Sequence, residues 1–222
     1  MGYCDDPAIL DAVPRRVFLD IDPGFPQMWR ALGLHDAFAG HDRFATLARN
    51  IGTPGCTIPT CGLDWITLPQ PIVLDETFEQ AFDIHEGDRK DIDALEAHGW
   101  RLVDPLVVAA GPDAYRRYVA ASKAEFVVPK HMYVETRGGL LSDRSAAYLA
   151  SGRPVLARDT GLDSLYPLGS GLVTFTTPDE AVAGVAAIAT DYLRHCRAAR
   201  EIAAAEFDSD RVLSRFLEDI LS

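Results

Sequence analysis

The chain has 222 residues, of which 48% are apolar and 24% are charged, a composition typical of a globular protein that excludes a disordered or fibrous chain. Its 21 basic and 33 acidic residues give a net charge of −12, which excludes a broadly basic nucleic-acid-binding surface but leaves room for a local anion site. Because we find neither an apolar run of about 18 residues nor a secretory leader, we expect a cytoplasmic protein without a membrane span.

The first part of the chain predicts a small α/β unit. Short apolar runs indicate strands, and Pro23-Gly24 ends the first of them. The expected elements are a strand over 17–19, a helix over 27–34, a strand over 44–47 and a loop over 53–65. Prolines make residues 68–75 an extended linker, because proline removes a backbone donor and biases its neighbours to extended states. We therefore predict a reduced amino-terminal α/β segment over residues 1–70 and a second domain over residues 71–222.

The second part alternates between strands and helices. We expect strands over 80–85, 100–104, 124–129, 153–157 and 171–175, and helices over 88–99, 112–123, 142–152, 178–207 and 209–222. The long helix over 178–207 should break near Asp191 or His195. Such alternation predicts an α/β fold with a Rossmann-like parallel sheet and helices on both faces, in which ligands bind beyond the carboxyl ends of the strands.

Cysteines and histidines give no clear metal motif. The cysteines are Cys4, Cys56, Cys61 and Cys196. Cys56 and Cys61 have four residues between them, but zinc would need a second close pair of ligands, and His35 and His41 stand in no recognised spacing. We therefore expect reduced structural thiols and no metal site.

The loop over 130–141 and the helix after it combine the parts of an anion site. Gly138 and Gly139 allow the backbone to approach a ligand closely, and the helix that opens at Ser142 or Asp143 offers free N–H groups. The cationic side chains nearby are Lys130, Arg137 and Arg144. Asp159, Thr160 and Gly161 follow the next strand and could contact a sugar or a phosphate. The alternatives are a surface ion pair for Arg144 and a simple turn at the glycines.

Three segments carry a resemblance to a known family. These are "SDRSAAYLASGRPVLARDTGL" (142–162), "TPDEAVAGVAAI" (177–188) and "HCRAAREIAAAEFDSDRVLSRFL" (195–217). They resemble the donor-binding domain of GT-B glycosyltransferases, in particular the bacterial group 1 type, over about residues 100–221. Residues 17–29 and 40–46 resemble the amino-terminal domain more weakly. Two departures stand out: Ala147 and Gly139 occupy the slots of the usual paired glutamates, and the amino-terminal domain is short.

The resemblance implies a metal-independent, hexosyltransferase-type enzyme that takes a nucleotide-diphosphate sugar as donor and needs no separate cofactor. The residues we assign to the donor are Lys130, Arg137, Gly138, Gly139, Ser142, Asp143, Arg144, Asp159, Thr160 and Gly161. For an acceptor base we favour His41, whose alternative is a capping or surface role, and then Asp20 or Asp22. The rival interpretation is a non-catalytic nucleotide-sugar-binding or oligomerising partner, and in either case we expect a homodimer.

Overall fold

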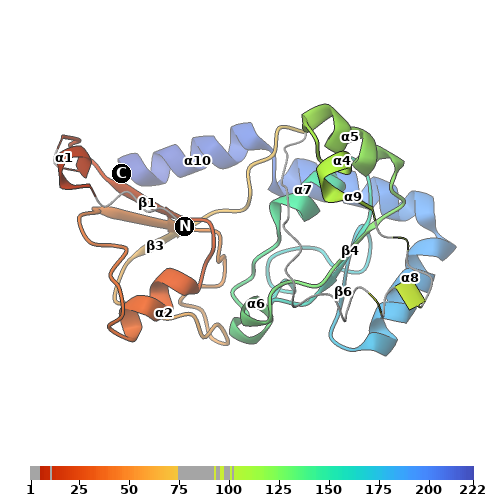
Figure 1. Cartoon of the computed structure of the whole chain (residues 1–222), viewed down its shortest axis with the longest axis horizontal. Coiled ribbons are helices and arrows are strands. Elements are labelled where there is room, and N and C mark those ends of the chain that lie inside the picture. Colours follow the sequence, from red (N-terminus) through yellow and green to blue (C-terminus); the bar gives the residue numbers. More distant parts are fainter. Residues whose placement is uncertain (1–5, 11, 75–92, 94–95, 98–100, 102) are drawn as a thin grey trace.

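The computed structural model describes residues 6–10, 12–74, 93, 96–97, 101 and 103–222, which contain two three-stranded parallel sheets (Figure 1). The first sheet has the order β1-β2-β3 and the second has the order β4-β5-β6. The strands are β1 (Val17–Asp20), β2 (Arg43–Thr46), β3 (Trp65–Thr67), β4 (Glu125–Val127), β5 (Val155–Arg158) and β6 (Leu172–Phe175). Every strand pair within them is parallel, so the predicted α/β class is confirmed.

Helices surround both sheets. They are α1 (Pro7–Leu10), α2 (Phe25–Ala31), α4 (Pro105–Val108), α5 (Pro112–Ala121), α6 (His131–Thr136), α7 (Asp143–Ala150), α8 (Pro178–Thr190), α9 (Tyr192–Glu206) and α10 (Ser209–Leu221). On β5 the alternation of side chains assigns the two faces. Val155 and Ala157 pack with α7 and α9, whereas Leu156 packs with Ile188 of α8. The second sheet is therefore covered on both sides, as a Rossmann-like domain requires.

The final helix returns to the first sheet, where it lies along β1 and β3 (Figure 1). Val212 of α10 packs with Ala45, Leu47 and Leu68, and Arg15 Nη1 donates to the carbonyl oxygen of Ile220 at 3.0 Å. The opposite face of this sheet holds an aromatic cluster centred on Phe18, Phe38, Phe44 and Trp65. The division into residues 1–70 and 71–222 stays a prediction, but α10 packs on the sheet formed by the first of these ranges.

Several predicted elements differ from the observed ones. The segment over 130–141, expected as a loop, contains the short helix α6. Trp65 belongs to β3 rather than to the loop over 53–65. The predicted strand over 80–85 and most of the helix over 88–99 lie outside the described residues, and no strand is formed by Arg101, Val103 or Asp104. The long helix breaks at Asp191, one of the two expected positions.

Candidate functional site

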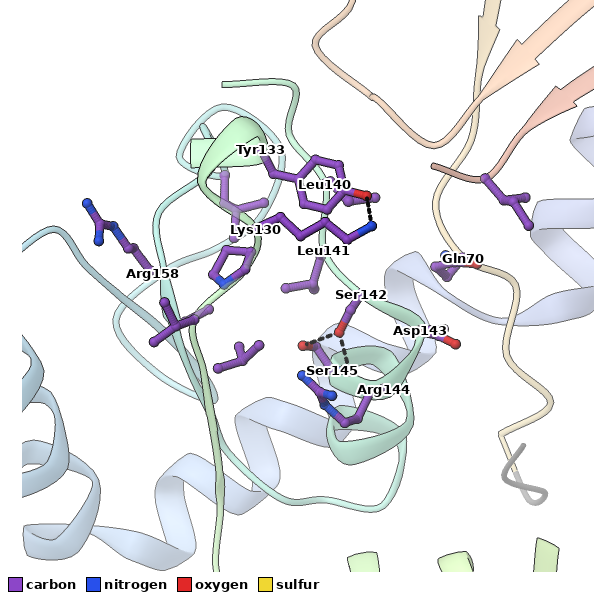
Figure 2. A pocket seen from close by; sticks show the side chains of 16 residues that line it. Gln70, Lys130, Tyr133, Leu140, Leu141, Ser142, Asp143, Arg144, Ser145 and Arg158 are labelled. Atoms are coloured by element: carbon purple, nitrogen blue, oxygen red, sulfur yellow. Dashed lines mark hydrogen bonds between the residues drawn. The ribbon is translucent and has the colours of Figure 1, made fainter. Parts of the chain in front are cut away.

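A pocket of about 520 Å³ opens where the second sheet faces the first (Figure 2). Ile21, just after β1, and Gln70, after β3, form the wall that belongs to the first sheet. The rest of the lining comes from residues that follow β4, from the first turn of α7 and from the end of β5. Because the carboxyl ends of parallel strands meet at one edge, the loops after β4 and β5 are brought together there.

The first turn of α7 projects its backbone amides toward this pocket. Ser142 is the N-cap: its Oγ accepts from the Ser145 amide at 3.0 Å and shares a hydrogen bond of 2.9 Å with the Ser145 hydroxyl. The first amides of a helix have no partner within the helix, and the helix dipole makes this end positive. Ser142, Asp143, Arg144 and Ser145 all line the pocket, so this helix terminus lies in its wall, and its role in binding an anion stays a prediction.

Arg144 reaches the pocket but carries a partner of its own. Its Nε donates to Oε1 of Glu125 at 2.6 Å, and the Glu125 side chain is only 4% exposed. Burial raises the pKa of Glu125 against the opposing effect of the guanidinium. Burial would lower the pKa of Arg144, but its attraction to Glu125 prevails and raises that pKa. The pair therefore holds a charged Arg144 in place and neutralises much of its charge. Sequence reasoning missed Glu125, whose signal was an acid inside the apolar strand "AEFVV".

Lys130 is also paired, across the gap between the two sheets. Its Nζ lies 3.2 Å from both carboxylate oxygens of Asp22, 5.2 Å from the ring centre of Phe25 and 5.5 Å from that of Tyr133. The predicted diphosphate ligand Lys130 and the predicted base Asp22 therefore bind each other. Figure 2 shows Lys130 beside Tyr133.

Arg158 is a cationic side chain of the pocket that sequence reasoning did not assign. It ends β5 and lines the pocket on the side opposite to Gln70 and Asp143 (Figure 2). Its Nε is buried and donates no hydrogen bond, and we find no ion pair for it within the described part of the chain. The available signal was its position as the last residue of the strand "PVLAR".

Gly138, Gly139 and Gly161 are not among the residues that line this pocket, and their assignment to the donor stays a prediction. A Cβ on Gly138 would lie 2.7 Å from Cδ1 of Ile58, and one on Gly139 would lie 2.5 Å from Cδ1 of Leu165. At Gly161, with φ of +90°, a Cβ would lie 2.9 Å from the side-chain amide nitrogen of Asn50. Protein atoms therefore occupy the space that these glycines leave open.

Asp159 and Thr160, which precede Gly161 in the loop after β5, stabilise loops by hydrogen bonds. Thr160 is buried, and its hydroxyl donates to the carbonyl oxygen of Leu140 at 2.8 Å. Asp159 accepts from the amides of Gly161 and Leu162 at 2.9 and 3.0 Å and from Arg137 Nη1 at 3.0 Å. Burial would raise the pKa of Asp159, but these hydrogen bonds prevail and lower it. The structure thus ties Arg137 to Asp159 and does not bring either into the pocket lining.

Asp20 and His41 are candidate bases that are not among the residues that line the pocket. Asp20 is 1% exposed and accepts from Gln27 Nε2 at 2.6 Å and from the Thr46 hydroxyl at 2.9 Å, while burial raises its pKa. His41 precedes β2, so the four-residue strand, about 13 Å long, separates it from the carboxyl edge of the sheet. The His41 ring packs instead against Phe18, at 5.3 Å between ring centres.

Among the described residues, no three His, Cys, Asp or Glu side chains are grouped so that they could hold a metal ion. Cys56, Cys61 and Cys196 are free thiols. A search of the described helices for one long and apolar enough to cross a membrane finds none.

Comparison with known protein families gives a match. The model of a family described as glycosyl transferase-like matches residues 87–218, more than half of the chain. Among curated proteins, no match is found. The family match confirms the resemblance that was carried by residues 142–162 and 195–217, and the parallel α/β architecture agrees with a GT-B-type domain. The chain belongs to the glycosyl transferase-like family.

Proposed function

We propose that the pocket binds a nucleotide-diphosphate sugar and that the protein transfers the sugar to an acceptor. One observation carries this proposal: the capped amino-terminus of α7 opens into a pocket whose wall also holds Lys130, Arg144 and Arg158. A diphosphate leaving group gains negative charge in the transition state, and preorganised amides and cations stabilise that charge. These side chains would supply the positive charge locally, so we expect donor binding to persist in the presence of a chelator.

Arg158 is the best test of the diphosphate position, because Glu125 and Asp22 partly neutralise the other two cations. We predict that Arg158→Ala weakens the binding of UDP or GDP about tenfold or more, since a charge-assisted hydrogen bond contributes roughly 1.5–3 kcal/mol. Calorimetric titration with a panel of UDP-, GDP- and TDP-sugars would measure it. Arg117→Ala, on the exposed face of α5, is the matched control and should bind like the wild type. Equal affinities for both variants would reject this position for the diphosphate.

Arg144→Ala, the obvious variant from the sequence, should also weaken binding by tenfold or more, but it leaves Glu125 buried without its cation. Its unfolding midpoint should therefore fall together with its affinity. Measuring both quantities separates loss of the fold from loss of the ligand contact.

A non-catalytic nucleotide-sugar-binding protein is the alternative, and the placement of the three candidate bases favours it. Asp20 is buried, His41 lies at the other end of the sheet and Asp22 is paired with Lys130. Of the three, only Asp22 could act as a base near the pocket, and only if Lys130 released it. An assay for nucleotide release would decide: a transferase turns over and loses activity in Asp22→Asn, whereas a binder titrates its ligand without turnover. A homodimer and a cytoplasmic location stay predictions.

A further inference from the structure

A second pocket, of about 380 Å³, lies beside the segment that leaves β3. Thr67, Leu68 and Pro69 line it, whereas the next residue, Gln70, lines the first pocket. The segment therefore runs between the two pockets. The other walls come from the end of α9, from α10 and from Arg49 after β2.

Three arginines line this second pocket. Arg211 and Arg215 are four residues apart on α10 and therefore share one face of that helix. Arg49 approaches from the loop after β2, with its guanidinium carbon 5.1 Å from the ring centre of Tyr166. Guanidinium groups that converge from separate elements are suited to the oxygens of a phosphate.

The hydrogen-bonding capacity of these guanidinium groups is only partly used. Arg49 Nη1 is buried and donates no hydrogen bond, although it lies 3.7 Å from Oε2 of Glu206. Arg211 Nη1 donates to the carbonyl oxygen of Ala204 at 3.2 Å, which fixes that side chain against the end of α9. Arg215 makes no ion pair or hydrogen bond with any residue that the structure describes. Arg49 and Arg211 are thus held in place by other parts of the protein, and Arg215 is the third cation of the pocket.

Two carboxylates, from Glu206 and Asp219, also line the pocket. Three arginines less two acids leave a net charge of +1 in this lining, in a chain whose net charge is −12. Glu206 competes with a ligand for Arg49, so it should weaken the binding of an anion without abolishing it. Removing the Glu206 charge should therefore strengthen anion binding, whereas removing an arginine of the pocket should weaken it.

We propose that this pocket is a second anion site, separate from the donor pocket, which holds a phosphate group between Arg49, Arg211 and Arg215. The volume exceeds what a phosphate ion fills, which suits a phosphomonoester with a small organic part. The proposal does not depend on the function assigned to the first pocket, because the two pockets share no lining residue.

The test is calorimetric titration of the full chain at pH 7 with inorganic phosphate and with glycerol 3-phosphate. Arg215→Ala should weaken binding of both probes about tenfold, because it removes a charge-assisted contact from an exposed residue that the fold does not need. Arg197→Ala, at an exposed arginine of α9 outside the pocket, should bind as the wild type does. Tighter binding of glycerol 3-phosphate than of phosphate would identify the ester as the preferred form, and the reverse order would identify the free ion.

Weaker binding in an arginine variant could also arise from unfolding, and Glu206→Gln separates the two explanations. It should bind phosphate about threefold more tightly, since it removes a half-exposed ion pair that competes for Arg49. Absence of phosphate binding to the wild type, or an affinity that depends on Arg158 and not on Arg215, would overturn the proposal. An unchanged affinity in Glu206→Gln would exclude Arg49 from the site and overturn the three-arginine arrangement.

Discussion

At the scale of single residues, His195 shows how burial fixes a protonation state. Its ring is 4% exposed within α9, and its Nδ1 accepts the amide hydrogen of Gly171 at 3.2 Å. Burial, together with the neighbouring charge of Arg194, lowers the pKa of His195 below its usual value. The neutral imidazole therefore links α9 to the loop that leads into β6, and protonation would break this link.

We predict that His195 makes the protein less stable in mild acid. The folded-state pKa lies below the unfolded value of about 6.5, so the unfolded chain binds more protons as the pH falls through that value, and stability is lost. His195→Asn offers an acceptor without a titrating ring, so its free energy of unfolding should vary less between pH 7 and pH 5. Urea unfolding at several pH values would measure the difference. His131→Asn, at an exposed histidine of α6, should keep the wild-type slope.

Sequence reasoning identified several residues of the site but not their partners. Ser142 was expected at the start of a helix and caps α7, because capping depends on residues only three positions apart. Glu125 and Arg144 are separated by 19 positions, and nothing local indicates that they pair. The same holds for Lys130 and Asp22, which follow strands of two different sheets. Charge balance in the pocket could therefore not be predicted from spacing alone.

At the scale of elements, the contact between the β6 loop and α9 is unusually close. Gly171 has φ of +76°, and a Cβ there would lie 2.4 Å from the Ala199 nitrogen and 2.6 Å from the Ala198 carbonyl carbon. Backbone atoms cannot move aside as a flexible side chain can. This glycine therefore sets how closely α9 packs on the second sheet.

A matched pair of glycine substitutions tests this contact. Gly169 also has a positive φ, +94°, but a Cβ added there would have no other atom within 4 Å. Gly169→Ala should cost about 1–2 kcal/mol, the strain of a left-handed alanine. Gly171→Ala should cost roughly 3 kcal/mol or more, because overpacking adds to that strain. Denaturant unfolding of both variants would compare them, and equal losses would contradict the close contact.

Elements with a strong pattern were predicted well. The helix expected to begin at Pro178 does begin there as α8, and the structure shows a capping box of Thr177 and Glu180 at its start. The helix α6 was missed because six residues are too few to show a helical period. Gly138 and Gly139 were expected to let the backbone approach a ligand, whereas the atoms that lie close to them in the structure are side chains of the protein itself.

At the scale of the whole molecule, Asn50, in the loop after β2, links the part with the first sheet to loops of the part with the second sheet. Its amide nitrogen Nδ2 donates to the carbonyl oxygens of Gly161 at 2.7 Å and Arg137 at 3.2 Å, and its backbone N–H donates to the carbonyl oxygen of Gly138 at 3.0 Å. The side chain lies in the space left by Gly139 and Gly161. Sequence reasoning could not foresee this link, which joins positions about ninety to a hundred and ten residues apart.

We predict that Asn50→Ala destabilises the protein by about 2–3 kcal/mol, because the buried Gly161 carbonyl oxygen and the part-buried Arg137 carbonyl oxygen lose their donor. Asp22→Asn removes another polar link between the two parts, the more exposed pair with Lys130, and should cost less than about 1 kcal/mol. Thermal or urea unfolding would rank the two variants. The reverse order would show that the Lys130–Asp22 ion pair stabilises the fold more than Asn50 does, and would contradict the prediction.

The return of α10 to the first sheet has a consequence for synthesis on the ribosome. Leu47 and Leu68 are translated early, whereas Val212 and Phe216, which shield them, follow only after all strands of the second sheet. A nascent chain that ends after β3 would therefore expose an apolar surface to water until α10 has been translated. Chaperone capture of stalled chains, released once α10 has emerged, is the behaviour that this order of assembly demands.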